Sequence, residues 1–207
     1  MRKLFYLIVL SMFSLAQAGS YEDFFQAVVS DDASMIRALL QRGFDPNARD
    51  PQGQTGLYLA MRSNASQAAD ALLKAPSIEV DALNEAGETA LMMAALKGHT
   101  GWVRRLLETG AKVDKTGWTP LHYAATGPEP AVVKLLLERG AAIDARSPNR
   151  STPLMMAAQY GSEASVELLL LQGADPRAKN DLGLGAADFA RLAKRDELAA
   201  KLDRLAR

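Results

Sequence analysis

The chain has 207 residues, and its 24 Lys and Arg balance 24 Asp and Glu, so its formal charge is zero. Hydrophobic residues make up 48% and charged residues 23% of the chain, values that exclude a mostly disordered or polytopic membrane protein. Without an excess of positive charge, binding to nucleic acid or to an anionic membrane surface is disfavoured. The absence of cysteine excludes disulfides, thiolate zinc sites and a cysteine nucleophile.

Residues 1–18 have the pattern of a cleaved secretory signal peptide. An Arg-Lys pair follows the first methionine, residues 4–15 are apolar apart from two serines, and Ala16-Gln17-Ala18 is the small-x-small pattern of a cleavage site. As a helix the apolar run rises about 18 Å, too short to anchor in a bilayer core of roughly 30 Å. We therefore expect cleavage after Ala18 and export of a chain that keeps no membrane anchor.

One short motif recurs through the remaining residues, at intervals of 30 to 34 residues. It opens with Thr and continues into Ala, and its clear copies begin at Thr55, Thr89, Thr119 and Thr152. A leucine pair and then Gly110, Gly140 or Gly173 follow the last three of these copies. Degenerate copies at the two ends place Glu22 and Gly185 in the Thr position. The chain is therefore built from successive copies of one unit.

The residues of each copy predict two short helices. Thr119 supplies an N-cap and Pro120 suits the first helical position, where its missing N–H costs nothing. The second helix carries Val132, Val133 and Leu136 on one face and stops at Gly140, which is suited to a left-handed C-cap. A hairpin this small cannot bury its apolar face alone, so the hairpins must stack.

The copy from Gly117 to Ala141 resembles the ankyrin repeat, as does nearly all of the chain after residue 18. Gly56 in place of Pro, and Met92 and Met155 in place of His, depart from the family pattern, and three residues are missing before Trp118. The resemblance implies an all-α solenoid of about five to six stacked helix-turn-helix units in a single domain over residues 19–207. The approximate unit boundaries are 19–49, 50–83, 84–113, 114–146, 147–179 and a cap at 180–207.

Few residues in the sequence could act in catalysis or bind a metal ion. His122 stands where the histidine of the ankyrin motif ties neighbouring loops together, and His99 lies in a Gly-His turn, so a structural role is expected for both. Asp114, Asp144 and Asp175 recur at the same position of successive copies, which is typical of turn chemistry. We therefore expect no catalytic residue, no metal site, no cofactor and no enzymatic activity.

The resemblance places binding on the loop tips and on the exposed positions of the first helices, which form a concave face in ankyrin proteins. One position of the first helix is apolar in five copies, and we call these five residues the apolar stripe: Leu59, Met93, Tyr123, Met156 and Phe189. Such side chains suit an interface, although the same position also packs against the next unit. Trp118 and Tyr160 complete the predicted contact set.

These observations predict a non-enzymatic module that binds another protein through the concave face. We expect it to act in the periplasm as an accessory, inhibitor or immunity-type partner of an exported protein, and to be a monomer. A secreted effector that engages a host protein is the alternative, and a small-ligand-binding or enzymatic role is less favoured.

Overall fold

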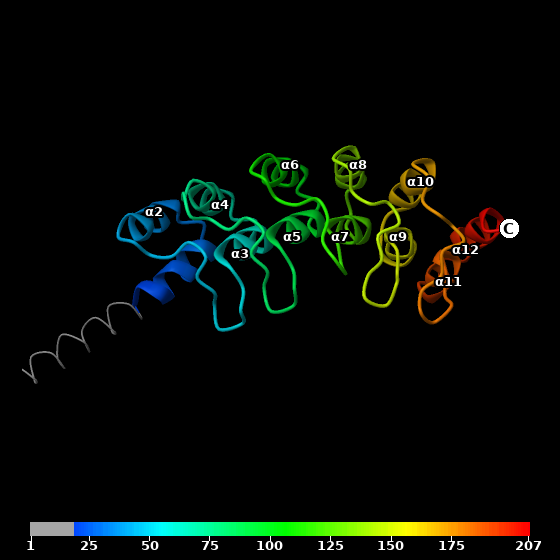
Figure 1. Cartoon of the computed structure of the whole chain (residues 1–207), viewed down its shortest axis with the longest axis horizontal. Helices are drawn as coiled ribbons and strands as arrows, with labels where there is room; N and C mark the ends of the chain where they lie inside the picture. The colour runs from blue at the N-terminus through cyan, green and yellow to red at the C-terminus, as the bar shows by residue number, and fades with distance from the viewer. Residues whose placement is uncertain (1–18) are drawn as a thin grey trace, which may run out of the picture. The chain divides into compact units, whose positions relative to one another are not determined.

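The computed structural model describes residues 19–207, which are helical and contain no named strand (Figure 1). The predicted signal peptide lies outside the described residues. The chain divides into two compact units, one ending at Gly87 and the other running from Glu88 to Arg207. The prediction of an all-α ankyrin-type fold is confirmed.

The first unit contains a helix over residues 19–29 followed by three further helices. These are α2 (Ala33–Gln41), α3 (Gly56–Ser63) and α4 (Ser66–Leu73). Helix α4 packs against both α2 and α3. Glu22, which the repeat register placed in the Thr position, lies inside the 19–29 helix instead of at a helix start. Glu22 therefore does not act as the N-cap that Thr provides in the regular copies.

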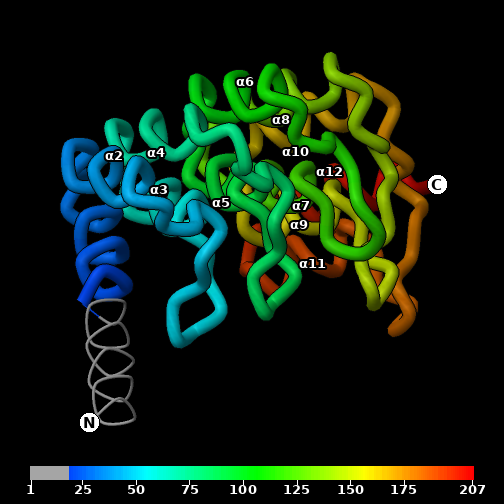
Figure 2. Tube along the Cα trace, turned by 60° about the vertical axis from the view of Figure 1, so that its left-hand side comes forward, coloured from blue at the N-terminus to red at the C-terminus, as the bar shows by residue number. Residues whose placement is uncertain are grey.

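The second unit consists of four helical hairpins in a stack. Its helices are α5 (Ala90–Leu96), α6 (Thr100–Glu108), α7 (Pro120–Thr126), α8 (Pro130–Glu138), α9 (Pro153–Tyr160), α10 (Glu163–Leu171), α11 (Ala186–Leu192) and α12 (Asp196–Leu205). The first helices α5, α7, α9 and α11 pack in one row and α6, α8 and α10 in another, with the loop tips beyond the first row (Figure 2). The core lies between the rows and includes Leu121, Leu136 and Leu154, all fully buried.

The predicted helix caps are present. The Thr152 hydroxyl accepts a hydrogen bond from the Met155 N–H at 3.3 Å, and Pro153 is the first residue of α9. Gly140 ends the α8 hairpin with a φ of 88°, and the Ala141 N–H donates to the Leu136 carbonyl at 3.0 Å. Helix starts and stops in the regular copies therefore follow from local residue chemistry.

Neighbouring hairpins approach each other through their backbones at Gly161. A Cβ added there would lie 2.1 Å from the Ala125 carbonyl oxygen and 3.0 Å from the Ala157 Cα. Neither atom belongs to a flexible side chain, so the stack has no room for a methyl group at this point. Glycine is required here by packing and not by φ, which is −85°.

We predict that Gly161→Ala destabilises the protein by about 1 to 3 kcal/mol, because the new methyl group must push α9 away from α7. Urea unfolding monitored by circular dichroism measures this loss.

Gly101→Ala is the matched control, because nothing lies within 4 Å of a Cβ at that exposed helical position. Replacing Gly by Ala within a helix is expected to leave stability unchanged or to raise it by up to about 1 kcal/mol. Equal effects of the two substitutions would contradict the close approach at Gly161.

Candidate partner-binding surface

The loop tips of the second unit are tied to one another by side chains that bind backbone carbonyls. Arg146 donates from Nη1 to the Arg150 carbonyl at 3.0 Å within its own tip and to the Lys179 carbonyl at 2.9 Å in the next tip. In the tip shortened by three residues, Lys115 donates from Nζ to the Thr116 carbonyl at 3.0 Å and the Trp118 carbonyl at 3.3 Å. The tips are therefore held in place.

The recurring aspartates are structural, but only Asp175 makes a local turn bond of the expected kind, accepting from the Arg177 N–H at 2.9 Å. Asp114 accepts a hydrogen bond from the Ala142 N–H at 2.8 Å, and Asp144 accepts one from the Asp175 N–H at 3.1 Å. These two carboxylates thus bind the backbone of the following loop. Among the described residues, no cluster of three or more His, Asp or Glu could hold a metal ion.

His122 joins two hairpins. Its side chain is buried, and its Nδ1 accepts from the Thr119 N–H at 3.2 Å. Its Nε2 lies 3.0 Å from the carbonyl of Ser151, which can only accept, so the bonded tautomer carries its hydrogen on Nε2. Burial lowers the pKa of His122, so the imidazole is neutral near pH 7. The expected tie between neighbouring loops is therefore present.

The ring of Trp118 packs against the imidazole of His122. The two rings meet edge to face with centroids 5.2 Å apart and an interplanar angle of 78°. Trp118 is half-buried, so part of its side chain remains accessible. Trp118 therefore both covers His122 and contributes to the surface.

His99 begins helix α6 without a side-chain capping hydrogen bond. Burial, followed by the nearby charge of Lys97, lowers its pKa. No cluster of acidic or histidine ligands surrounds it among the described residues.

The structure narrows the predicted contact set. Leu59, Met93 and Phe189 are buried, so in this structure they contribute to packing. Tyr123 and Met156 are half-buried on the packed helices α7 and α9, and the Tyr123 hydroxyl donates to the Glu88 carboxylate at 2.6 Å. Tyr160, at the end of α9, is 59% exposed. The accessible members of the set are therefore Trp118, Tyr123, Met156 and Tyr160.

Sequence reasoning missed an apolar ridge on the tips. Leu182 is 79% exposed, and Pro148 is exposed on the preceding tip. The tips touch, because the Asp181 N–H donates to the Asn149 carbonyl at 3.1 Å and a Cβ on Gly117 would lie 3.6 Å from the Pro148 Cγ. We call Trp118, Pro148 and Leu182 the tip ridge. The sequence signal for this exposed surface was Leu182, an apolar residue that stands between Asp181 and Gly183 within a turn.

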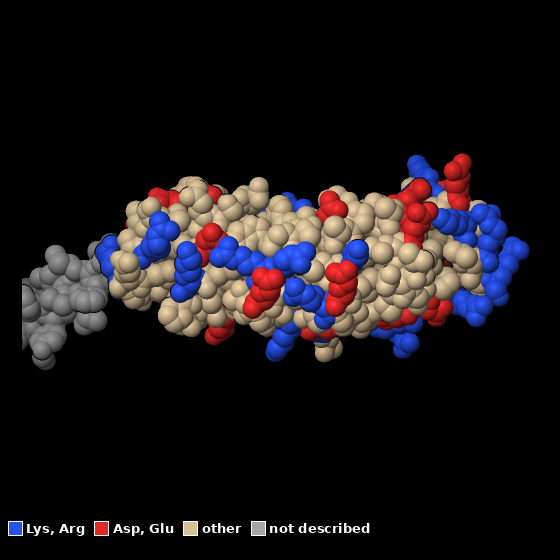
Figure 3. Space-filling view, turned by 90° about the horizontal axis from the view of Figure 1, so that it is seen from above, with Lys and Arg blue, Asp and Glu red and all other residues tan. Residues whose placement is uncertain are grey.

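Charged side chains gather on the last hairpin of the second unit (Figure 3). The exposed cations Lys194, Arg204 and Arg207 give this end the basic character that the sequence indicated. Others are paired, with Arg191 on Asp188 at 2.9 Å and Lys201 on Glu167 at 2.7 Å. Leu182 of the tip ridge lies on the loop that leads into this hairpin, whereas Trp118 and Pro148 lie on earlier tips.

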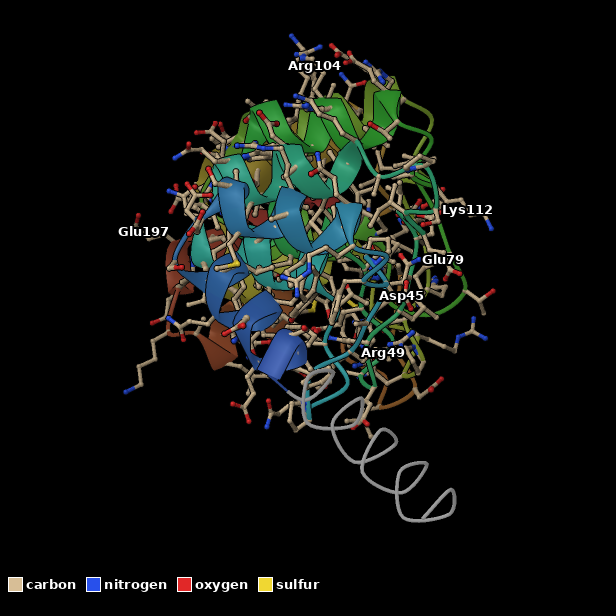
Figure 4. All side chains as sticks on the ribbon, turned by 90° about the vertical axis from the view of Figure 1, so that its left-hand side faces the viewer. Asp45, Arg49, Glu79, Arg104, Lys112 and Glu197 are labelled. Atoms are coloured by element: carbon tan, nitrogen blue, oxygen red, sulfur yellow. The ribbon has the colours of Figure 1, made fainter. Side chains whose placement is uncertain are left out.

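The first unit has a shallow groove of its own, about 270 Å³, between the ends of α2 and α4. Leu40, Phe44 and Pro76 line it. At its loop side Asn47 donates to the Ser77 carbonyl at 2.7 Å and accepts from the Glu79 N–H at 2.8 Å. Asp45 and Glu79 extend from these loops (Figure 4).

The stacked hairpins with tied loop tips define a repeat protein whose accessible apolar residues lie on tips and helix ends. The family model of ankyrin repeats matches three overlapping stretches, residues 24–116, 68–147 and 110–180. The chain belongs to the ankyrin-repeat family. Within the described residues, no helix is both long and apolar enough to span a bilayer.

Two similar relatives are much longer than this chain. The chain is 35% identical over 172 residues to human SH3 and multiple ankyrin repeat domains protein 2, covering 81% of this chain and 9% of that protein. It is 34% identical over 161 residues to the mouse B-cell lymphoma 3 protein homolog, covering 74% of this chain and 36% of that protein. The chain thus spans only a small part of these relatives.

Among solved structures, the chain is similar to one from Bdellovibrio bacteriovorus. That structure is a predatory endopeptidase in complex with an immunity protein. The similarity has a TM-score of 0.75 and 26% identity, and it covers 88% of this chain and 97% of the matched chain. In contrast to the longer relatives, nearly the whole matched chain is covered.

We predict that Trp118→Ala lowers the free energy of unfolding by about 1 to 3 kcal/mol, because the half-buried indole packs on His122. Tyr160→Ser, at an exposed position, should change it by less than about 0.5 kcal/mol. Thermal or urea unfolding of both variants tests the assignment, and a large loss with Tyr160→Ser would place that residue in the packing instead.

Proposed function

We propose that this chain is a non-enzymatic binding protein that restrains an exported partner, in an immunity-type, inhibitory or accessory role. The observation that carries this proposal is the near-complete coverage of a chain from an endopeptidase–immunity protein complex. Membership of the ankyrin-repeat family supports the general role of binding another protein, because ankyrin repeats bind other proteins. The partner we favour is therefore an exported enzyme, and a peptidase in particular.

The contact surface we propose is the tip ridge together with the accessible side chains of the first helices in the second unit. Trp118 and Leu182 supply apolar area on tips whose backbones are tied together, and Tyr160 supplies an exposed aromatic ring. Because these groups are held before binding, little conformational entropy is lost on association. A small set of aromatic and aliphatic anchors can then dominate the affinity.

Export to the periplasm is part of the proposal. It is supported by the positive start, the apolar run and the small-x-small pattern of residues 1–18. The chain needs no oxidative folding because it lacks cysteine, which suits such a compartment.

We predict that the exported protein begins at Gly19. Amino-terminal sequencing of the protein purified from the periplasmic fraction of a bacterial producer measures this. A chain that retains residues 1–18 in the cytoplasm would overturn the export proposal, and a Gly19 terminus found only in the medium would favour the secreted alternative.

We predict that Leu182→Asp and Tyr160→Asp each weaken partner binding by at least about tenfold, since a charge replaces an apolar contact that would be desolvated in the complex. The measurement is cross-linked affinity capture from the producing cell, followed by titration of the purified partner with each variant. If the partner is a peptidase, near-stoichiometric loss of its activity with the unaltered chain supports inhibition.

Leu171→Asp is the matched control. Leu171 is 81% exposed, almost the same as Leu182, but it ends the second helix α10 and lies outside the proposed surface. Equal weakening by Leu171→Asp and Leu182→Asp would contradict the tip ridge as the contact surface. Capture of no specific protein would contradict the binding role itself.

A further inference from the structure

The cap of the central helix α7 differs chemically from those of its neighbours. In α5 and α9 the N–H of the capping Thr donates to a methionine sulfur, from Thr89 to Met92 and from Thr152 to Met155, each at 3.4 Å. In α7 the Thr119 N–H donates to the imidazole Nδ1 of His122 instead. A thioether does not titrate in mild acid, whereas an imidazole does.

The remaining cap of the second unit carries a carboxylate. The Gly185 N–H donates to Asp188 at 2.8 Å, and this bond is the main cause of the lowered pKa of Asp188. Asp188 therefore stays ionised in mild acid, and its cap stays intact. Among the four first-helix caps of this unit, the one at His122 is the cap that mild acid can alter.

His122 connects three features through one ring. Nδ1 binds the α7 cap, Nε2–H donates to Ser151 in the next tip, and the ring edge meets Trp118 of the tip ridge. Only 1% of the residue is exposed. Loss of the neutral imidazole would therefore affect the helix start and two adjacent tips together.

A proton on Nδ1 changes the α7 cap. The protonated Nδ1 can donate to the Thr119 hydroxyl oxygen, 2.9 Å away, but the Thr119 N–H loses its acceptor while buried. The imidazolium would also be buried, and this desolvation is the largest cause of the lowered pKa of His122.

Hydrogen bonds to the Ser151 and Ala145 carbonyls and the charge of Asp114 oppose the effect of burial on the pKa of His122. Asp114 favours the protonated form, but its effect is smaller than that of burial. Lys115 holds the Trp118 carbonyl with its ammonium group, and its charge cannot stabilise an imidazolium. Because the closed form binds a proton less readily than an opened form, acid shifts the balance towards opening.

We propose that His122 is an acid-sensitive pin of the tip ridge: a protonated ring still donates from Nε2 to Ser151, but it leaves the Thr119 N–H of the α7 cap without its acceptor and buries a charge between two tips, and the tips that carry Trp118 and Pro148 loosen. The tips are closed when the imidazole is neutral, and they open as the pH falls below the ordinary imidazole range. The consequence for partner binding rests on the proposed function, since it requires the tip ridge to be the contact surface.

The test uses the full chain with Trp102→Phe, which leaves Trp118 as the sole tryptophan. Acrylamide quenching of Trp118 and amide hydrogen exchange are measured between pH 7.5 and pH 5. We expect protection factors at residues 115–119 and 147–152 to fall by up to about tenfold per pH unit below pH 6.5, with a parallel rise in quenching.

The matched variant is His122→Met, which copies the caps of α5 and α9 and removes the titrating group. Its Trp118 signal and its protection factors should not change with pH over this range, while His99→Gln should respond like the unaltered chain. An acid response that persists in His122→Met, or no response in the unaltered chain, would overturn the proposal. If the tips open in acid but the captured partner stays bound, the acid-sensitive role of His122 is supported and the tip ridge is not the contact surface.

Discussion

Stacking of neighbouring hairpins is the constraint on which the rest of this structure depends. A single pair of helices of seven to ten residues cannot bury its own apolar face, so each hairpin of the second unit depends on the next. At Gly161 the stack is tight enough that a Cβ would collide with the Ala125 carbonyl. The positions of the loop tips, and hence of the candidate surface, follow from this packing.

The same packing makes the tips suitable for binding. Loops are usually mobile, but here Arg146 and Asp144 bind the backbone of the next tip and fix one loop to another. Apolar residues such as Leu182 are therefore exposed on a rigid support. A rigid apolar ridge lowers the ordering cost of binding a partner.

The fold was largely predictable because its signals are local. The Thr-Pro start at Thr119 and the glycine stop at Gly140 act within one helix turn, and their recurrence set the length of the unit. The copy at Glu22 was the exception. It lacks the capping residue and the proline, so its helix is already formed at residue 19. The accessible site was less predictable, since exposure depends on residues from other copies.

The sequence by itself determined the family and the helical hairpins, because these depend on residue types at fixed short spacings. Only the tertiary structure decided that Phe189 is buried while Tyr160 is exposed, and that Trp118 rests on His122. It also brought the His122 ring to Ser151, 29 residues further along the chain. The physical reason is that burial and long-range hydrogen bonds arise where separate hairpins meet, and no short stretch of sequence contains both sides of that contact.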